Sequence, residues 1–384
     1  MTVHINARFL TQTTSGVQRF ARGWLGALDA RLASDPALAA RLGPMRAWVP
    51  AGRPIQEDPG WSQITLSPLP GAKGHIWEQT VLARQVGSDP LLSLCGSGPL
   101  ACRNQLLVLH DANIWTNPHA FSPAYRWFHR PMRAQLAHRV RSLATVSAYS
   151  AQTLAAHLCV PTDRFHLLSN SADHITAVTP DPDALHRHGL THGRFMLTVG
   201  NMTPNKNLAR MVQAVHRLPD DAPILAVAGT AATGMRNDPL SGSDRVRPLG
   251  RLEDTDLAAL YRGAAGFVWP ALSEGFGIPP LEAMAMGVPV LSSDRTAMPE
   301  VLGDAPLYFD PENVEDITRA LKRLITMPEA ERAAMVRKGH TRANCYSWAA
   351  GVDALVEIIA DLQTTAATTE RSWQQIRPYA VPSN

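Results

Sequence analysis

Cysteine is scarce in this sequence of 384 residues, which contains only four: Cys95, Cys102, Cys159 and Cys345. No two of them form a Cys-x-x-Cys pair, and no histidine stands near them at the spacing of a zinc site. We therefore expect free, buried thiols, and neither a disulfide framework nor a cysteine-based metal site.

Long apolar runs and a strong net charge are also missing. No run approaches the ~18 apolar residues that a membrane-spanning helix needs, and the start MTVHINARFL lacks the basic residues and long apolar core of a secretion signal. The net charge of +3 is small, so the charge balance implies no nucleic-acid partner. We expect a cytoplasmic protein that binds no nucleic acid.

The chain has enough apolar residues to fold into large cores, since 45% of its residues are hydrophobic and 18% are charged. At roughly 150 residues per domain, two or three domains are expected. Short apolar runs alternate with segments of helical periodicity, which predicts an α/β protein with parallel sheets. The predicted strands are Thr2–Asn6, Ala47–Val49, Ile64–Leu66, Leu91–Leu94, Gln105–Leu109, Leu143–Val146, Arg164–Leu168, Phe195–Val199, Ile224–Gly229, Phe267–Trp269, Val288–Leu291 and Leu307–Phe309.

The most informative stretch runs from Gly266 to Ser293 and reads GFVWPALSEGFGIPPLEAMAMGVPVLSS. Its pattern predicts a buried strand, a loop containing glycine, a helix and a second buried strand. Pro279 and Pro280 suit the first helical positions, which places Glu282 in the first turn, where a carboxylate opposes the positive end of the helix dipole. Gly287 would end this helix.

Two glutamates, Glu274 and Glu282, stand in this stretch with seven residues between them. In open α/β sheets, ligands bind beyond the carboxyl ends of the strands, and Gly275 and Gly277 would let backbone amides approach a ligand closely. Two glutamates at this spacing are common on surface helices. Their combination with the glycine pair, the double proline and the second strand resembles the donor-site motif of retaining nucleotide-sugar glycosyltransferases of family 4.

This resemblance implies the GT-B fold, with two Rossmann-like domains facing a central cleft, the nucleotide sugar on the second domain and the acceptor on the first. Residues 1–173 would form the N-terminal, acceptor-side domain, and 174–193, with two prolines and several histidines, the linker. Residues 194–345 would form the donor-binding domain. Residues 346–384 would be a terminal helix that crosses back to the N-terminal domain, followed by a tail.

A turn that carries Lys206 follows the predicted strand Phe195–Val199 and precedes an amphipathic helix. Backbone amides, the helix dipole and an ammonium group together suit a diphosphate, although an exposed lysine in a capped turn is the simpler reading of the residues alone. Lys206 matches the phosphate-binding lysine of the family. Many members also carry an arginine in this turn, where this chain has Asn201 and Asn205, so one positive charge of the expected clamp is missing.

Two residues of the first domain match positions of the family. Gly16 lies at a helix entry next to a Ser15/Gln18 capping box; the turn itself could require it, and the family places such a glycine over the donor diphosphate. His110 follows the apolar strand Gln105–Leu109. A lone histidine is more often structural, but the family places a histidine here, near the sugar and the reacting bond.

The resemblance also assigns roles to the remaining site residues. Lys206 and amides near Gly16 would stabilise the charge on the departing diphosphate, and Glu274 would hold sugar hydroxyls. Glu282 would bind the ribose. The other donor-binding residues would be Asn205, Gly275, Phe276 and Gly277, together with Arg251 and Leu252 in a loop that resembles the base-binding loop of the family.

Neither a cofactor nor a metal is expected. The chain has two D-x-D sequences, Asp181-Pro182-Asp183 in the predicted linker and Asp254-Thr255-Asp256 in the first turn of a predicted helix, where acidic residues are common. The family's proposed mechanism lets the leaving diphosphate take the acceptor's proton on the same face of the sugar. Transfer would therefore retain the anomeric configuration without a metal.

The acceptor side contains a basic segment, Pro123–Arg141, in which Arg126, Arg130 and Arg133 are spaced to share one helical face. Pro131 would kink or restart that helix. The sequence Trp77-Glu78-Gln79 resembles one found in a subgroup of the family that builds surface polysaccharides. This resemblance and the basic segment together suggest a glycan or lipid-linked acceptor. They also suggest peripheral contact with the inner face of the cytoplasmic membrane. An ordinary solvated helix and a packed tryptophan are the alternatives.

Two other functions remain compatible with the sequence. A nucleotide-sugar epimerase or phosphorylase on the same fold would use a different second substrate, and epimerisation without an acceptor would reveal the former. A non-catalytic sugar-nucleotide sensor would bind the donor with no turnover on any acceptor.

Overall fold

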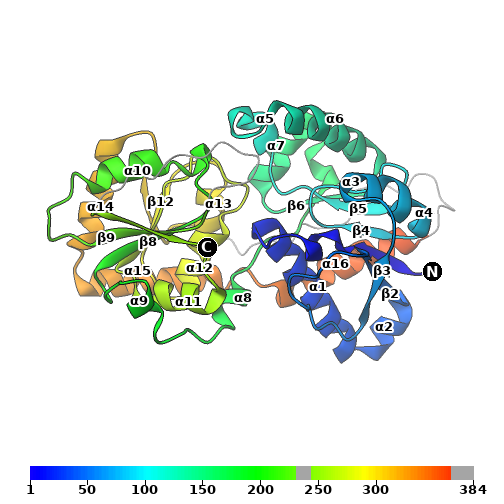
Figure 1. The fold of residues 1–384 in the computed structure, drawn as a ribbon, viewed down its shortest axis with the longest axis horizontal. Coiled ribbons are helices and arrows are strands. Elements are labelled where there is room, and N and C mark those ends of the chain that lie inside the picture. The colour runs from blue at the N-terminus through cyan, green and yellow to red at the C-terminus, as the bar shows by residue number, and fades with distance from the viewer. Residues whose placement is uncertain (231–243, 365–384) are drawn as a thin grey trace. The chain divides into compact units, whose positions relative to one another are not determined.

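The computed structural model describes residues 1–230 and 244–364, which form two compact units (Figure 1). Unit 1 contains Met1–Ala112, Trp127–Asn170 and the chain from Ser347, and unit 2 contains Asn113–Arg126 and Ser171–Tyr346. The polar sequence after the predicted strand Ile224–Gly229 predicts a loop at Ala231–Asp244, which lies outside the described residues except for Asp244.

Unit 1 is built on a parallel sheet of seven strands in the order β3-β2-β1-β4-β5-β6-β7. Its middle strands are short and fully buried, as expected for a parallel sheet covered on both faces. The strands are β1 (Val3–Asn6), β2 (Met45–Pro50), β3 (Ile64–Leu69), β4 (Leu91–Ser93), β5 (Gln105–Val108), β6 (Ser142–Thr145) and β7 (Phe165–Leu167).

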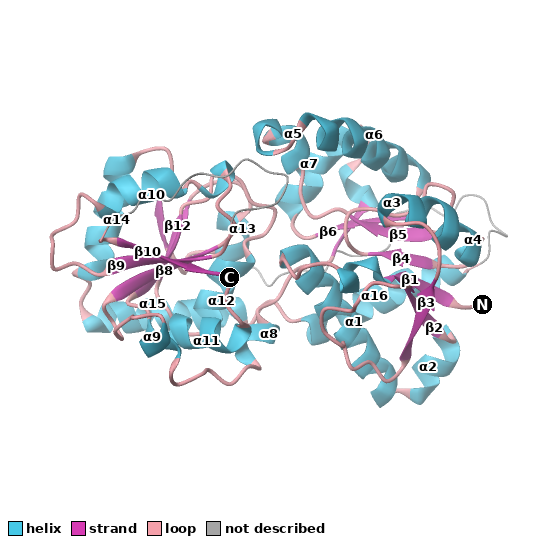
Figure 2. Cartoon of the chain, in the orientation of Figure 1, coloured by secondary structure: helices cyan, strands magenta, loops and turns pink. Residues whose placement is uncertain are grey.

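Helices connect these strands in the pattern of a doubly wound fold, and Figure 2 shows them on both faces of the sheet. The larger ones are α1 (Gly16–Ser34), α6 (Pro123–Arg139), α7 (Ala148–Leu158) and α16 (Trp348–Gln363), and the part of α6 before Trp127 belongs to unit 2. The shorter ones are η1 (Ala7–Thr11), α2 (Pro36–Leu42), α3 (Gly74–Trp77), η2 (Glu78–Leu82), α4 (Ala83–Val86), α5 (Asn113–Thr116), η3 (Pro118–Ala120) and η4 (Thr162–Arg164), of which α5 and η3 belong to unit 2.

Unit 2 is built on a parallel sheet of six strands in the order β10-β9-β8-β11-β12-β13. The strands are β8 (Phe195–Val199), β9 (Ile224–Ala228), β10 (Val246–Gly250), β11 (Gly266–Trp269), β12 (Val290–Ser293) and β13 (Leu307–Phe309). One face of this sheet packs against α10 (Leu208–Val215) and α14 (Val314–Ile325) in a core that includes Met211 and Leu321.

The other helices of unit 2 are α8 (Asp173–Thr176), α9 (Ala184–Arg187), η5 (Pro204–Lys206), α11 (Asp254–Gly263), α12 (Ile278–Ala285), α13 (Met298–Leu302) and α15 (Glu329–Ala343). The segment predicted as a linker thus contains two short helices, α8 and α9, and both pack against α11. Neither shows a long apolar period, because each makes a single turn.

Both sheets reverse their strand order next to their first strand, between β1 and β4 in unit 1 and between β8 and β11 in unit 2. The predicted α/β class with two Rossmann-like sheets is therefore confirmed. Chains of this kind bind ligands beyond the carboxyl ends of the two strands at such a switch point.

The last helix, α16, packs against α1 in unit 1 through two glycines. A Cβ atom on Gly23 would lie 2.4 Å from the indole of Trp348, and one on Gly351 would lie 2.9 Å from the indole of Trp24. Each glycine makes room for a tryptophan of the other helix. Arg141, whose Nη2 donates to Asp361 at 3.1 Å, also attaches α16 to unit 1.

Two helices differ from their prediction. Helix α12 begins at Ile278, so Glu282 lies in its second turn and not in its first, because the loop ends one residue before the prolines. Helix α6 runs from Pro123 to Arg139 and continues through Pro131, so it does not restart there. None of the described helices is long and apolar enough to cross a membrane.

Candidate functional site

Two groups of predicted donor residues of unit 2, one around Lys206 and one around Glu274, lie beyond the carboxyl ends of β8 and β11, at the switch point of the sheet. The turn η5 follows β8 and carries Lys206, and the loop after β11 carries Glu274. These residues are 68 positions apart in the sequence, and the topology brings them into contact.

The ammonium group of Lys206 forms an ion pair with Oε1 of Glu274. It also lies 4.4 Å from the centre of the Trp269 indole ring, close enough for a cation–π interaction. Both side chains are largely buried, 19% exposed for Lys206 and 14% for Glu274. The positive charge is therefore fixed at the edge of the sheet.

Backbone contacts hold these two loops together. The N–H of Leu272 donates to the carbonyl of Asn205 at 2.8 Å, and the amide of Asn205 donates to the carbonyl of Ser273 at 3.4 Å. The N–H of Glu274 donates to Oγ1 of Thr296 at 3.1 Å. Asn205, directly before Lys206, thus fixes the position of the loop that carries Glu274.

Asn207 is a site residue that the sequence prediction missed. Its backbone has a φ of +57°, in the left-handed region that asparagine tolerates better than most residues. Its buried amide donates to the carbonyls of Pro270 at 3.1 Å and Pro311 at 2.7 Å. Asn207 thereby joins the turn after β8 to the loops after β11 and β13. The sequence gives only one sign of this role, a polar residue directly before an apolar helix.

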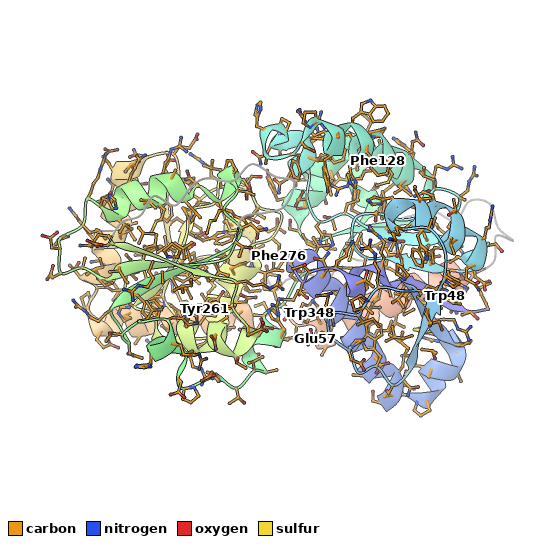
Figure 3. All side chains as sticks on the ribbon, in the orientation of Figure 1. Trp48, Glu57, Phe128, Tyr261, Phe276 and Trp348 are labelled. Atoms are coloured by element: carbon orange, nitrogen blue, oxygen red, sulfur yellow. The ribbon has the colours of Figure 1, made fainter. Side chains whose placement is uncertain are left out.

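The loop after β11 ends at Gly277, whose φ is +89°. A Cβ atom here would lie 2.5 Å from the side chain of Met298, so both the backbone and the packing require glycine. The preceding Phe276 is buried and packs edge-on against Tyr346, with ring centres 5.3 Å apart (Figure 3 labels Phe276). The loop is therefore anchored by its aromatic side chain.

Glu282 is buried, with 4% of its surface exposed, and lies one turn into α12. Its Oε2 accepts a hydrogen bond from the hydroxyl of Tyr261 at 2.7 Å, and its Oε1 lies 2.7 Å from Nε2 of His174. Since a carboxylate oxygen accepts, Nε2 of His174 is the donor. Figure 3 labels Tyr261 on α11.

His174 and Tyr261 were not predicted as site residues. His174 lies on α8, in the segment predicted as a linker, and Tyr261 belongs to the apolar face of α11. Both hold the carboxylate of Glu282 by hydrogen bonds, so they fix the orientation of a predicted ribose-binding residue. A histidine in a linker and a tyrosine on a packed face give no local signal of such a contact.

The predicted base-binding residues, Arg251 and Leu252, lie in the turn between β10 and α11. Arg251 is exposed and Leu252 is partly buried. The neighbouring carbonyl of Gly250 accepts a hydrogen bond from the N–H of Gly229 at 2.7 Å, which fixes the end of β10 against β9.

In unit 1, His110 follows β5, at the carboxyl edge of that sheet. Its Nε2 lies 2.8 Å from the carbonyl of Leu94, so Nε2 must carry a proton, and its ring packs edge-on against Phe20 with centres 4.7 Å apart. Burial lowers the pKa of His110, and the charge of Arg133 lowers it further, against the opposing effects of the Leu94 carbonyl and Asp111. The neutral form, with Nδ1 as the acceptor, is favoured.

Gly16 is the first residue of α1 and is exposed. The predicted capping contact is present, because the N–H of Ser15 donates to Oε1 of Gln18 at 3.1 Å. On α6, the spacing of Arg126, Arg130 and Arg133 places them on one helical face as predicted, and all three are half-buried. The exposed side of this helix carries aromatic residues instead: Tyr125, Trp127 and Phe128.

The two D-x-D sequences share an arginine. Nη2 of Arg187 donates to Asp181 at 2.8 Å and to Asp256 at 2.6 Å, and Asp256 also pairs with His188 at 2.8 Å. Within residues 1–230 and 244–364, no three histidine, cysteine or acidic side chains are grouped as a metal site would require.

Comparisons with known proteins agree with this geometry. A family model described as "Glycosyl transferases group 1" matches residues 186–342, which include Lys206, Glu274 and Glu282. The O-antigen chain mannosyltransferase B of Escherichia coli is 30% identical over 265 residues, which cover 65% of this chain and 68% of that protein. The chain belongs to the group 1 glycosyl transferases. The glycosyltransferase recognised from the central motif is thus confirmed.

Other relatives are mannosyltransferases as well. The serotype-specific mannosyltransferase WbdA of Escherichia coli is 30% identical over 63% of this chain, which spans 31% of that longer protein. The O-antigen chain mannosyltransferase RfbU of Salmonella typhimurium is 26% identical over 59% of this chain and 63% of its own length.

Solved structures of glycosyltransferases share the fold. The sucrose-phosphate synthase of Thermosynechococcus elongatus aligns with a TM-score of 0.69 at 16% identity, over 94% of this chain and 98% of that one. Anabaena HepE in complex with UDP and glucose aligns with a TM-score of 0.69 at 13% identity, over 94% and 99% of the two chains. The predicted GT-B fold is therefore confirmed across nearly the whole chain.

Proposed function

We propose that this glycosyltransferase moves mannose from a nucleoside-diphosphate mannose to a growing bacterial surface polysaccharide, with retention of anomeric configuration and without a metal. The names of its relatives support the sugar and the product. The observation that carries the site is the contact between Lys206 and Glu274. A donor has its sugar and its diphosphate side by side, so neighbouring carboxylate and ammonium groups suit its two parts.

Lys206 supplies the charge stabilisation in this proposal. As the bond to the anomeric carbon breaks, negative charge grows on the diphosphate, and a fixed cation in a mostly buried position stabilises it more than water would. The cation–π contact with Trp269 and the ion pair with Glu274 hold the ammonium in place before the donor arrives. This lysine takes the role that a metal ion has in other transferases.

Glu274 and Glu282 have different roles. Glu274 would accept hydrogen bonds from sugar hydroxyls, with the amides of Gly275, Phe276 and Gly277 beside it. Glu282 would accept a ribose hydroxyl in addition to the bonds from Tyr261 and His174. His110 would contact the sugar near the reacting bond, and the amides near Gly16 would contact the diphosphate.

This division of roles predicts different kinetics for two variants. Glu282→Ala should weaken binding of the bare nucleoside diphosphate by about 1–3 kcal/mol, because a hydrogen bond to the ribose is lost. Glu274→Ala should leave that affinity nearly unchanged and lower kcat. Isothermal titration with the nucleoside diphosphate and steady-state kinetics with the nucleotide sugar measure the two effects. Equal losses in both assays for both variants would contradict the assignment.

Peripheral contact with the membrane is part of the proposal, through the exposed aromatic side of α6. Trp127 is 83% exposed and Phe128 is 40% exposed, and tryptophan is enriched at membrane interfaces. The half-buried Arg126, Arg130 and Arg133 add positive charge beneath them, worth roughly 1 kcal/mol each near an anionic leaflet.

A liposome assay tests this contact. The protein should sediment with anionic liposomes at low salt and be released at high salt, and Trp127→Ser should reduce sedimentation without changing donor hydrolysis. Replacement of the three arginines by glutamate should abolish sedimentation. If the unmodified protein did not sediment with the liposomes, the proposed membrane contact would be wrong.

A further inference from the structure

The switch point of the unit 1 sheet carries a second group of polar residues, which the donor site does not use. Asn6 ends β1, Arg8 follows it in η1, and Ser97 follows the neighbouring strand β4. Positions beyond the carboxyl ends of these two strands are where an open α/β sheet binds a ligand. In unit 2, the equivalent position holds Lys206 and Glu274.

Glu78 is the centre of this group, with 1% of its surface exposed. Its Oε1 accepts hydrogen bonds from Nδ2 of Asn6 at 2.8 Å, Nε of Arg8 at 3.0 Å and Oγ of Ser97 at 2.9 Å. Its Oε2 accepts from Nδ1 of His75 at 2.7 Å. Burial alone would raise the pKa of Glu78, but the bond from His75, the charge of Arg8 and the bond from Asn6 outweigh it and lower this pKa to about 2.

The residues beside Glu78 fix the surrounding loops. Gln79 donates to the carbonyl of Gly98 at 2.9 Å and accepts from the N–H of Leu100 at 2.9 Å, so it holds the loop after β4. Trp77 is buried and donates to the carbonyl of Leu69 at the end of β3 at 3.0 Å. The helix is wound as a π-helix from Glu78 to Leu82, a feature found frequently at functional sites.

Cations also approach this switch point from α6. Gly96, with a φ of +74°, lies so close to Arg133 that a Cβ atom would stand 3.4 Å from its Nη2. Nε of Arg133 is buried and has no hydrogen-bond partner within the described chain. The ring of His129 lies 5.0 Å from that of His75, and the ring of Phe128 lies 5.1 Å from that of His75.

Two guanidinium groups lie at this position. That of Arg8 pairs with Glu78 at 3.0 Å, and that of Arg133 lies beside Gly96. Burial, and after it the charges of Arg133, His75 and Arg8, lower the pKa of His129 to about 3, and Glu78 opposes them. Both Arg133 and the Asp111 carboxylate act on the neighbouring His110. An anion would accept a hydrogen bond from Nε of Arg133, which has no partner within the described chain.

We propose that Arg133, together with Arg8 and His75, which Glu78 holds in place, binds a phosphate or diphosphate group of the acceptor. Guanidinium groups suit this ligand because their planar donors match phosphate oxygens in pairs. The site lies on the unit that receives the acceptor in the proposed function, and the inference rests on that assignment. The phosphate has two potential sources, the diphosphate of a lipid-linked acceptor and a soluble sugar phosphate.

The first test is binding of inorganic pyrophosphate, measured by titration calorimetry in a Lys206→Ala background that removes the cation of the donor site. Arg133→Gln should weaken this binding by about tenfold or more, since a hydrogen bond between charged groups is lost. Arg139→Gln, an exposed arginine on the same helix, is the matched control and should leave it unchanged. His75→Gln is a second variant that should also weaken it.

The proposal would be overturned if pyrophosphate bound with the same affinity to Arg133→Gln, His75→Gln and the control, provided that the three variants have matched melting temperatures. This binding test needs no turnover, so it is independent of the reaction catalysed. The second test compares two acceptors, a mannose phosphate and a short-chain prenyl-diphosphate-linked sugar. Arg133→Gln should raise KM by about tenfold for the acceptor that supplies the phosphate, and unchanged KM for both acceptors would also overturn the proposal.

Discussion

In the proposed mechanism, Lys206 is the residue on which charge stabilisation depends most. It stands alone in its turn, because Asn201 and Asn205 occupy positions where an arginine would be expected. Its ammonium is fixed by Glu274 and by the ring of Trp269. A single fixed cation has no neighbour in the turn to replace it.

We therefore expect Lys206→Ala to lower kcat by on the order of a hundredfold or more, as for the removal of one charge-stabilising donor. Lys338→Ala, which removes an exposed lysine that pairs with Asp304, is the control and should keep kcat within a few fold. Initial-rate kinetics on a nucleotide sugar measure both. A Lys206 variant close to the unmodified enzyme would show that another cation has this role.

Sequence and structure agree best for residues whose role depends on a local motif. The positions of Lys206 and Glu274 at the sheet edge could be predicted because each residue lies in a turn or loop after a recognisable buried strand. Glu282 was placed in the wrong turn of its helix, since a residue count cannot fix where a loop ends. Asn207 and His174 were missed because their partners are distant in sequence, and side-chain contacts of that kind follow only from the tertiary structure.

At the scale of elements, the contact between α1 and α16 depends on glycines that face tryptophans. Gly23 and Gly26 lie on the same helix, but only Gly23 faces an indole ring: a Cβ atom on Gly26 would meet nothing within 4 Å. The two positions therefore separate the intrinsic effect of alanine in a helix from the effect of packing.

Gly26→Ala should stabilise the protein by about 0.5–1 kcal/mol, because alanine loses less backbone entropy in a helix. Gly23→Ala should destabilise it in spite of that gain, since overpacking costs about 1–3 kcal/mol. Urea denaturation followed by circular dichroism measures both. If both variants were stabilised equally, α16 would not be packed on α1 as described.

The long helices were easier to predict than the short ones. The amphipathic periods of α14 and α16 extend over 12 and 16 residues, long enough to be recognised in the sequence. The single turns α5, α8, α9 and α13 are too short to show a period, and the segment with α8 and α9 was therefore interpreted as a linker without structure. The π-helix at Glu78 depends on tertiary hydrogen bonds and has no sequence pattern of its own.

At the scale of the whole molecule, two parallel sheets show the same reversal of strand order. Each places polar residues beyond the strands that come first and fourth in its chain order, β1 and β4 in unit 1 and β8 and β11 in unit 2. The alternation of buried strands and helices was sufficient to predict this architecture, because parallel strands require helical crossovers. The unit 2 switch point contains the predicted donor residues. The unit 1 switch point, with Glu78, Arg8 and Arg133, was seen in the sequence only as a Trp-Glu-Gln motif and a basic helix.

The most direct test of the account is the stereochemistry of transfer. The protein should transfer mannose from an α-configured nucleoside-diphosphate mannose to a mannose-terminated acceptor in the presence of EDTA, and proton NMR of the product should show an α linkage. A β-linked product would contradict retention, and activity lost to EDTA and restored by a divalent ion would contradict the role of Lys206 as the only cation required. Donor binding without transfer to any acceptor would contradict the central claim that the chain is a mannosyltransferase.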